Sequence, residues 1–164
     1  MNYLEYIESR IWTPGKEFEW QLSVWRFHEH KIVFTNGCFD ILHLGHIDYL
    51  AKAAAEGSLL IIGLNSDESV KRIKGDSRPI TDQRSRSMAL ASLGFVDGVV
   101  IFDEDTPKRL IKMVQPDVLV KGKDYEEKDI IGADIVRKKG GEVVTMDIVE
   151  GYSTSAIIDK IKGS

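Results

Sequence analysis

Between residues 31 and 146, short apolar runs rich in β-branched residues alternate with amphipathic stretches. The runs are apolar on both faces, as expected of strands that are covered by helices on each side. Alternating strands and helices are typical of βαβ units around a parallel sheet. We therefore predict an α/β, Rossmann-like, doubly wound sheet of five parallel strands with helices on both faces. The predicted strands are Lys31–Thr35, Leu59–Leu64, Val96–Phe102, Val118–Lys121 and Glu142–Met146.

Helix boundaries are marked by residues that favour caps and stops. Ser66, Thr81 and Thr106 each stand directly before an acidic residue or a proline, which is typical of a helix start. Gly57 and the pair Gly140–Gly141 supply stops. These positions fall between the predicted strands, so they support the βαβ pattern.

The first thirty residues follow a different pattern. Two helical pieces, over Leu4–Arg10 and Glu17–His30, are separated by Thr13-Pro14-Gly15. The segment also contains three tryptophans, Trp12, Trp20 and Trp25. Tryptophans so close together are more often packing anchors than ligand platforms. We predict a helical extension over residues 1–30, docked on the sheet or on a second subunit of a homodimer, and one domain over residues 31–164.

The composition of the chain excludes some classes of binding partner and location. The chain of 164 residues has a net charge of -4, which argues against broad nucleic-acid binding because that needs a basic face. No apolar run or leader predicts a membrane span or export signal. The single cysteine, Cys38, excludes an internal disulfide framework and fits a reducing compartment. We expect a cytoplasmic protein.

The segment from Thr35 to His46 carries the densest chemical signal. It begins at the end of the first predicted strand and runs into a helix, where free N–H groups can hold an anion. Gly37 would let the backbone approach a ligand, and Gly45 would let the chain turn so that two imidazoles face one pocket. The residues of this segment predicted to bind the nucleotide or the substrate are Thr35, Asn36, Gly37, Cys38, Phe39 and Gly45.

His43 and His46 stand on either side of Gly45. Either histidine alone would be an ordinary loop residue, but the pair suits phosphoryl transfer, which depends on positioning and on stabilising charge. Cys38 lies beside them, yet no base stands next to it in a recognisable cysteine-enzyme pattern. We predict that the imidazoles are catalytic and that Cys38 only neighbours the phosphates.

His43-Leu44-Gly45-His46 resembles the signature of the His-x-Gly-His nucleotidyltransferases, which include cytidylyltransferases and adenylyltransferases of sugar phosphates. The resemblance implies that both histidines contact a triphosphate. A second family signature, a hydroxyl-rich turn that opens the last helix, is matched by Ser153, Thr154 and Ser155. These side chains could bind phosphate oxygens or could simply cap the helix.

Basic residues of the family are also matched in the middle of the chain. The loop Lys71–Pro79 offers Lys74, predicted to be catalytic, and Arg78, predicted to bind substrate; Lys71 and Arg72 could equally form a solvated face. Arg84 corresponds to a family arginine that helps to hold the site.

The segment Val120–Tyr125 resembles the family segment near the nucleotide. There Gly122 would allow close approach, and Asp124 could hold a ribose hydroxyl or serve as a turn residue.

Over Lys31–Lys162 the chain most closely resembles the heptose 1-phosphate adenylyltransferases, which make ADP-heptose for bacterial lipopolysaccharide. The resemblance implies AMP transfer from ATP to a sugar 1-phosphate, with Mg²⁺ accompanying the triphosphate and with no dedicated protein metal site. Some relatives are fused to a sugar kinase, and we expect this chain to be the stand-alone transferase. Ile148 and Ile158 replace basic residues of the family, which separates the chain from the glycerol 3-phosphate cytidylyltransferases.

Two alternatives stay open from the sequence. A CTP-dependent enzyme acting on a polyol phosphate would differ in only a few base contacts. A non-catalytic nucleotide-binding module could also use this fold, because fold alone does not specify activity.

Overall fold

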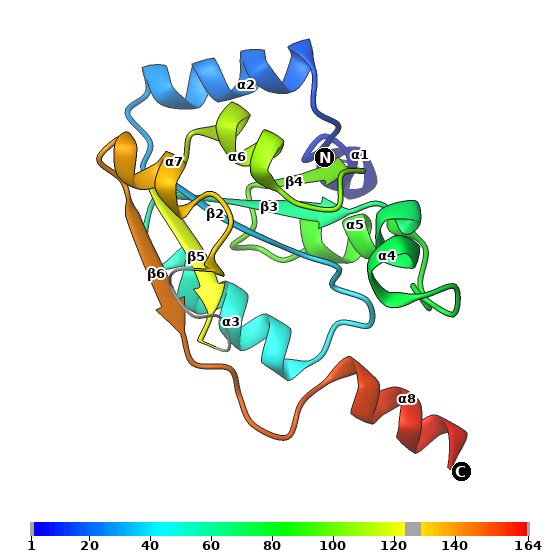
Figure 1. The fold of residues 1–164 in the computed structure, drawn as a ribbon. Coiled ribbons are helices and arrows are strands. Elements are labelled where there is room, and N and C mark those ends of the chain that lie inside the picture. Colours follow the sequence, from blue (N-terminus) through cyan, green and yellow to red (C-terminus); the bar gives the residue numbers. More distant parts are fainter. Residues whose placement is uncertain (1, 124–128, 164) are drawn as a thin grey trace.

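The computed structural model describes residues 2–123 and 129–163, which form a layered α/β structure (Figure 1). Within this part, the sheet has six parallel strands in the order β1-β4-β3-β2-β5-β6. They are β1 (Ile11–Trp12), β2 (Ile32–Gly37), β3 (Leu59–Asn65), β4 (Gly98–Phe102), β5 (Val118–Gly122) and β6 (Glu142–Met146). The five predicted strands are all present, which confirms the parallel Rossmann-like architecture.

The sixth strand, β1, corrects the predicted strand count. It lies inside the extension that was expected to be helical, between α1 (Tyr3–Glu8) and α2 (Lys16–Phe27). Ile11 and Trp12 pair with Val99 and Val100 of β4. A run of two residues is too short to show a strand pattern, so only the pairing with β4 defines it.

Helices cover both faces of the sheet and produce two apolar cores. Helices α3 (Leu44–Ala54) and α5 (Gln83–Ala91) pack on one face, while α2, α6 (Lys108–Val114) and α7 (Ala133–Lys138) pack on the other. Successive side chains of a strand point to opposite faces. In β2, for example, Val33 belongs to the core under α3, and Phe34 belongs to the core under α6.

The amino-terminal extension is anchored in this second core. Phe18 and Leu22 of α2 are fully buried. The rings of Trp12 and Trp25 meet edge to face at 5.6 Å, so these two tryptophans are packing anchors, as predicted. Trp20 instead is 68% exposed, and a homodimer through this segment stays a prediction.

Side-chain caps set several helix starts. Ser66 caps α4 (Asp67–Lys74) as predicted, accepting a hydrogen bond from the Ser69 N–H at 3.1 Å. Asp82, rather than Thr81, caps α5. Helix α6 starts at Lys108, one residue after Pro107, which therefore occupies the cap position instead of the first helical one.

The strand order places a ligand crevice between β2 and β5. From β2 the chain proceeds outward to β3 and β4 on one side and then returns to β5 and β6 on the other. Open parallel sheets bind ligands beyond the carboxyl ends of the strands at such a reversal. Helix α8 (Thr154–Lys162) follows β6 through a loop and stands off the two helical layers (Figure 1). No helix in residues 2–123 or 129–163 is long and apolar enough to span a membrane.

Candidate active site

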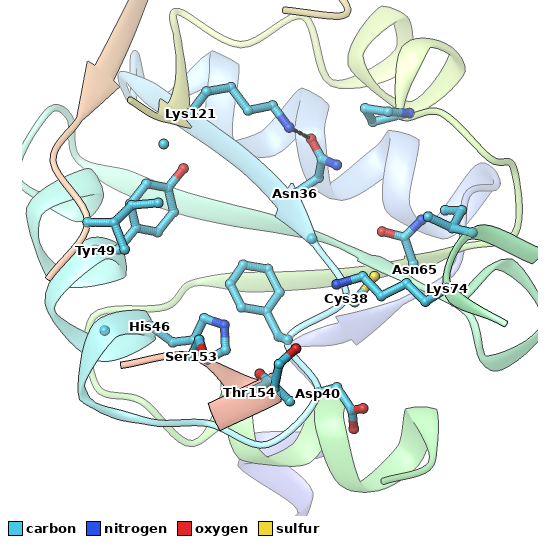
Figure 2. A pocket seen from close by; sticks show the side chains of 18 of the residues that line it. Asn36, Cys38, Asp40, His46, Tyr49, Asn65, Lys74, Lys121, Ser153 and Thr154 are labelled. Atoms are coloured by element: carbon cyan, nitrogen blue, oxygen red, sulfur yellow. Dashed lines mark hydrogen bonds between the residues drawn. The ribbon is translucent and has the colours of Figure 1, made fainter. Parts of the chain in front are cut away.

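A cavity of about 600 Å³ opens at the carboxyl ends of the strands. Its walls come from the β2–α3 loop, the end of α4, the end of β5 and the start of α8 (Figure 2). Most of the predicted site residues line it: Asn36, Gly37, Cys38, Phe39, His43, Gly45, His46, Lys74, Arg78, Gly122, Ser153, Thr154 and Ser155.

Three predicted site residues are placed differently. Thr35 is fully buried, and its hydroxyl lies 2.8 Å from that of Tyr49, so it ties β2 to α3 without lining the cavity. Arg84 points away from the cavity, with an 82% exposed side chain 3.6 Å from Glu8. Asp124 lies outside the described residues.

The two histidines stack against each other where α3 begins. His43 is the N-cap residue and His46 is three positions later, so both side chains lie on one side of the first turn. Their ring centroids are 3.9 Å apart, and the ring planes differ by 21°. Both Nδ1 atoms are buried and have no hydrogen-bond partner among the described residues. Buried polar atoms are normally paired, so these two indicate a ligand-binding role.

Both imidazoles are held neutral in the ligand-free protein. Burial is the main cause that lowers the pKa of His46 to about 4; the neighbouring His43 and Lys74 contribute to this shift, whereas a hydrogen bond with the Ile41 backbone acts against it. Burial also lowers the pKa of His43. A neutral imidazole keeps one N–H donor, and a bound phosphate would favour the protonated form with two donors.

Because the pKa of His46 is lowered, we expect both the stability of the fold and the binding of nucleotide to depend on pH. Its pKa falls from 6.5 in the unfolded chain to about 4 in the folded chain, so protonation destabilises the fold as pH falls through this range. A triphosphate beside the ring should raise the pKa and make nucleotide binding take up a proton. NMR titration of the His46 ring with and without ATP measures the change, and His46→Asn identifies the signal. Identical titration curves would contradict contact with the triphosphate.

Gly37 and Gly45 have no side chain, which leaves space for the neighbouring rings of Phe39 and His43. A Cβ at Gly45 would lie 3.1 Å from two atoms of the His43 ring and 3.3 Å from Cβ of Tyr152. A Cβ at Gly37 would lie 3.0 Å from the Phe39 ring. The prediction that Gly45 forms a turn is wrong, because Gly45 lies inside helix α3, where its lack of a side chain lets the His43 imidazole pack closely. At Gly37 the group that approaches the backbone closely is the Phe39 ring.

The loop between β2 and α3 is held in a strained shape by one buried carboxylate. Phe39 and Ile41 have φ angles of 45° and 62°, in the left-handed region that non-glycine residues rarely adopt. Between them, Asp40 accepts hydrogen bonds from the Ile80 and Thr81 N–H groups and from Arg78 Nε at 2.7 Å. Burial alone would raise the pKa of Asp40, but these hydrogen bonds outweigh it and lower the pKa. Arg78 is thereby fixed in the cavity wall.

Arg86 is the arginine of α5 that organises the site. Its side chain is fully buried and bonds the carbonyl oxygens of Cys38 at 2.7 Å and Asn65 at 2.8 Å, together with the Asp67 carboxylate at 2.7 Å. It thus joins the strained loop to the end of β3 and the start of α4. The family resemblance predicts this function for Arg84, which is two residues away and on a different face of the helix. The helical spacing from Arg86 to the buried Leu90 was the signal that could have identified it.

Cys38 remains a thiol at neutral pH. Burial raises its pKa, although Lys74, Arg86 and Arg78 act against this. A thiol is a poor nucleophile compared with a thiolate. This agrees with the prediction that Cys38 only neighbours the phosphates.

The start of α8 forms the wall beside His46 (Figure 2). Ser153 accepts a hydrogen bond from the Ala156 N–H at 3.1 Å, so it caps the helix as well as lining the cavity. The amino ends of α3 and α8 therefore both border the same space. Helix amino ends favour bound anions through their N–H groups and dipole.

Sequence reasoning missed several polar lining residues, among them Asn65 and Lys121 at strand ends and Tyr49 on α3. Lys121 donates a hydrogen bond to Asn36 across the β2–β5 crevice (Figure 2). The available signal was a polar residue at the end of an otherwise apolar strand. In residues 2–123 and 129–163, no group of three or more His, Cys, Asp or Glu side chains is placed to hold a metal ion.

The chain is similar in sequence to known proteins. The chain is 60% identical over 134 residues to the bifunctional protein HldE of Campylobacter curvus, covering 82% of this chain and 28% of that protein. HldE of Campylobacter jejuni subsp. jejuni is 56% identical over 147 residues, which are 90% of this chain and 31% of HldE. The chain thus spans less than a third of these relatives.

A solved structure shows the same relationship. It is the lipopolysaccharide core biosynthesis protein of Thermoplasma volcanium, with a TM-score of 0.59 and 31% identity, covering 76% of this chain and 99% of that one. A sequence profile described as cytidylyltransferase-like matches residues 34–160, the span that contains both histidines and the hydroxyl-rich turn. The chain belongs to the cytidylyltransferase-like family.

Proposed function

We propose that the protein transfers AMP from ATP to a sugar 1-phosphate, with heptose 1-phosphate as the preferred acceptor, and releases pyrophosphate. The observation that carries this proposal is the convergence of the stacked imidazoles of α3 and the hydroxyl-rich start of α8 on one cavity. Donors that converge in this way suit a triphosphate whose charge shifts during transfer.

The relatives support the choice of substrates. The Thermoplasma volcanium protein is described as a lipopolysaccharide core biosynthesis protein, and the HldE proteins are described as bifunctional. An enzyme that makes a nucleotide-activated heptose for lipopolysaccharide assembly is consistent with both descriptions. We further propose that the reaction takes place in the cytoplasm, where ATP is available.

The proposed chemistry is direct transfer. An oxygen of the acceptor phosphate forms a bond to the α-phosphorus while the bond from that phosphorus to the bridging oxygen breaks, and its electron pair leaves with pyrophosphate. The acceptor phosphate is already ionised near neutral pH, so no general base is needed. His43 and His46 donate hydrogen bonds to the transferring and leaving phosphates. Lys74 and Arg78 offset charge beside them.

Mg²⁺ is proposed to enter with the nucleotide. Beside the histidines the cavity wall offers nitrogen and hydroxyl donors, which suit phosphate oxygens, and the carboxylate there, Asp40, already accepts hydrogen bonds from Arg78 and two N–H groups. Mg²⁺ prefers oxygen ligands and retained water. The ion would therefore be held chiefly by the triphosphate. When bound, it supplies positive charge to the phosphate oxygens.

Pyrophosphate release tests the proposal. The purified protein is incubated with ATP or CTP, each with heptose 1-phosphate or glycerol 3-phosphate. We expect turnover with ATP and heptose 1-phosphate to exceed the other combinations. Preferred turnover with CTP and glycerol 3-phosphate would establish the cytidylyltransferase alternative. ATP binding without turnover on either acceptor would favour a nucleotide-binding module.

A further inference from the structure

Three polar residues at the ends of neighbouring strands share one face of the sheet. They are Asn65 on β3, Asn36 on β2 and Lys121 on β5, and these strands are adjacent in the order β3-β2-β5. On each strand, a residue two or four positions earlier packs in the core beneath α6: Ile61 precedes Asn65, Phe34 precedes Asn36, and Leu119 precedes Lys121. Because side chains alternate along a strand, the polar residues face the same side. The histidines belong to α3, which covers the opposite face.

Two of these side chains are buried, and all three are oriented by hydrogen bonds. Lys121 is 8% exposed and Asn65 is 4% exposed, whereas Asn36 is partly exposed. Lys121 donates to Oδ1 of Asn36, which leaves the Asn36 amide nitrogen as a donor. Asn65 donates through Nδ2 to Ser69 at 2.9 Å, and its Oδ1 points into the cavity (Figure 2). Burying an ammonium group and an amide is costly, so their presence in the wall of a cavity points to a polar ligand.

We propose that Asn36, Asn65 and Lys121 bind the hydroxyl groups of the acceptor sugar, an inference that rests on the proposed function. Sugar hydroxyls both donate and accept hydrogen bonds, and this cluster offers an ammonium donor, an amide donor and an amide acceptor. A triphosphate matches it poorly, because the amide oxygen would face an anion. A purine needs apolar walls, and Ile131 and Ile148 are the kind of lining residue that provides them.

Lys74 connects this cluster to the histidine end. Its ammonium group acts electrostatically on both Cys38 and His46. In Figure 2 the side chains of Lys74 and Cys38 lie together at one side of the cavity, at a height between Asn36 above and His46 below. A sugar 1-phosphate bound with its hydroxyls at Asn36 would therefore direct its phosphate past Lys74 toward the α-phosphate. The acceptor and the nucleotide thus occupy opposite ends of one cavity.

The test compares Lys121→Met with Lys123→Met. Lys123 follows β5 directly, but its side chain is 65% exposed and pairs with Asp147 at 2.9 Å, which makes it a matched control outside the cavity. Calorimetry measures heptose 1-phosphate binding in the presence of a non-hydrolysable ATP analogue, and ATP binding by itself. For Lys121→Met we expect the Kd of the sugar phosphate to rise about 10- to 100-fold, as for a lost hydrogen bond from a charged donor. The affinity for ATP should not change, and Lys123→Met should match the wild type.

The outcomes separate this inference from the proposed function. Unchanged sugar-phosphate binding in Lys121→Met, or a loss of ATP affinity in its place, overturns the inference. So does a wild-type protein that binds no sugar phosphate. If the wild type binds the sugar phosphate through Lys121 but releases no pyrophosphate, the inference stands and the proposed function fails. Should Lys121→Met not fold, Asn36→Ala is measured in the same way with the same expectation.

Discussion

Replacing Arg86 by methionine should lower the free energy of unfolding by about 3–5 kcal/mol, the usual effect of removing one partner from a buried ion pair. The guanidinium group is fully buried and donates to the carbonyl oxygens of Thr81, Cys38 and Asn65 as well as to the Asp67 carboxylate. Methionine fills similar space but leaves these acceptors without their donor. The strained loop around Asp40 would also lose its tie to Cys38. Urea unfolding followed by tryptophan fluorescence measures the change.

Arg84→Met is the matched control for this prediction. Arg84 lies on the same helix, carries the same charge and is 82% exposed. Its replacement should change stability by no more than about 0.5 kcal/mol, as is usual for surface positions. Equal destabilisation by both substitutions would mean that Arg86 acts only through net charge or helix propensity.

The second large effect is expected at His46. In the proposed reaction, His46→Ala should reduce kcat by about 10²- to 10³-fold, by analogy with the loss of one positioned oxyanion donor. The reduction should fall mainly on kcat, because the donor acts on charge that develops during transfer. His46→Ala also removes the ring's contacts with His43 and Phe39, so some loss of stability is expected in addition to the loss of kcat. Initial rates of pyrophosphate release, with an unfolding curve for each variant, test both parts.

His28→Ala provides the control, because His28 is exposed at the end of α2 and does not line the cavity. Its kcat should equal that of the wild type. If His46→Ala also kept its full kcat, the imidazoles would have no part in the chemistry, even if the protein still bound ATP.

Local pattern was sufficient for most of the fold. Strands β2 to β6 were predictable because each is a short run with apolar residues that pack into the two cores. Ser66 was predictable as a helix cap because its hydroxyl accepts a hydrogen bond from the Ser69 N–H within the same turn. Most of the candidate site followed from the same reasoning. Residues at the end of a parallel strand and at the start of the next helix meet at one edge of the sheet, wherever they stand in the sequence.

What the sequence determined by itself, then, was the set of buried strands and the edge at which His43, His46 and Ser153 meet. Tertiary structure decided the rest, because those features depend on partners distant in the chain. Strand β1 exists only through its pairing with β4, and Gly45 is needed because the His43 ring and Tyr152 close around it. The choice of Arg86 over Arg84 depends on which side of α5 faces the core, since only there does a guanidinium reach the carbonyl oxygens of β3 and the loop.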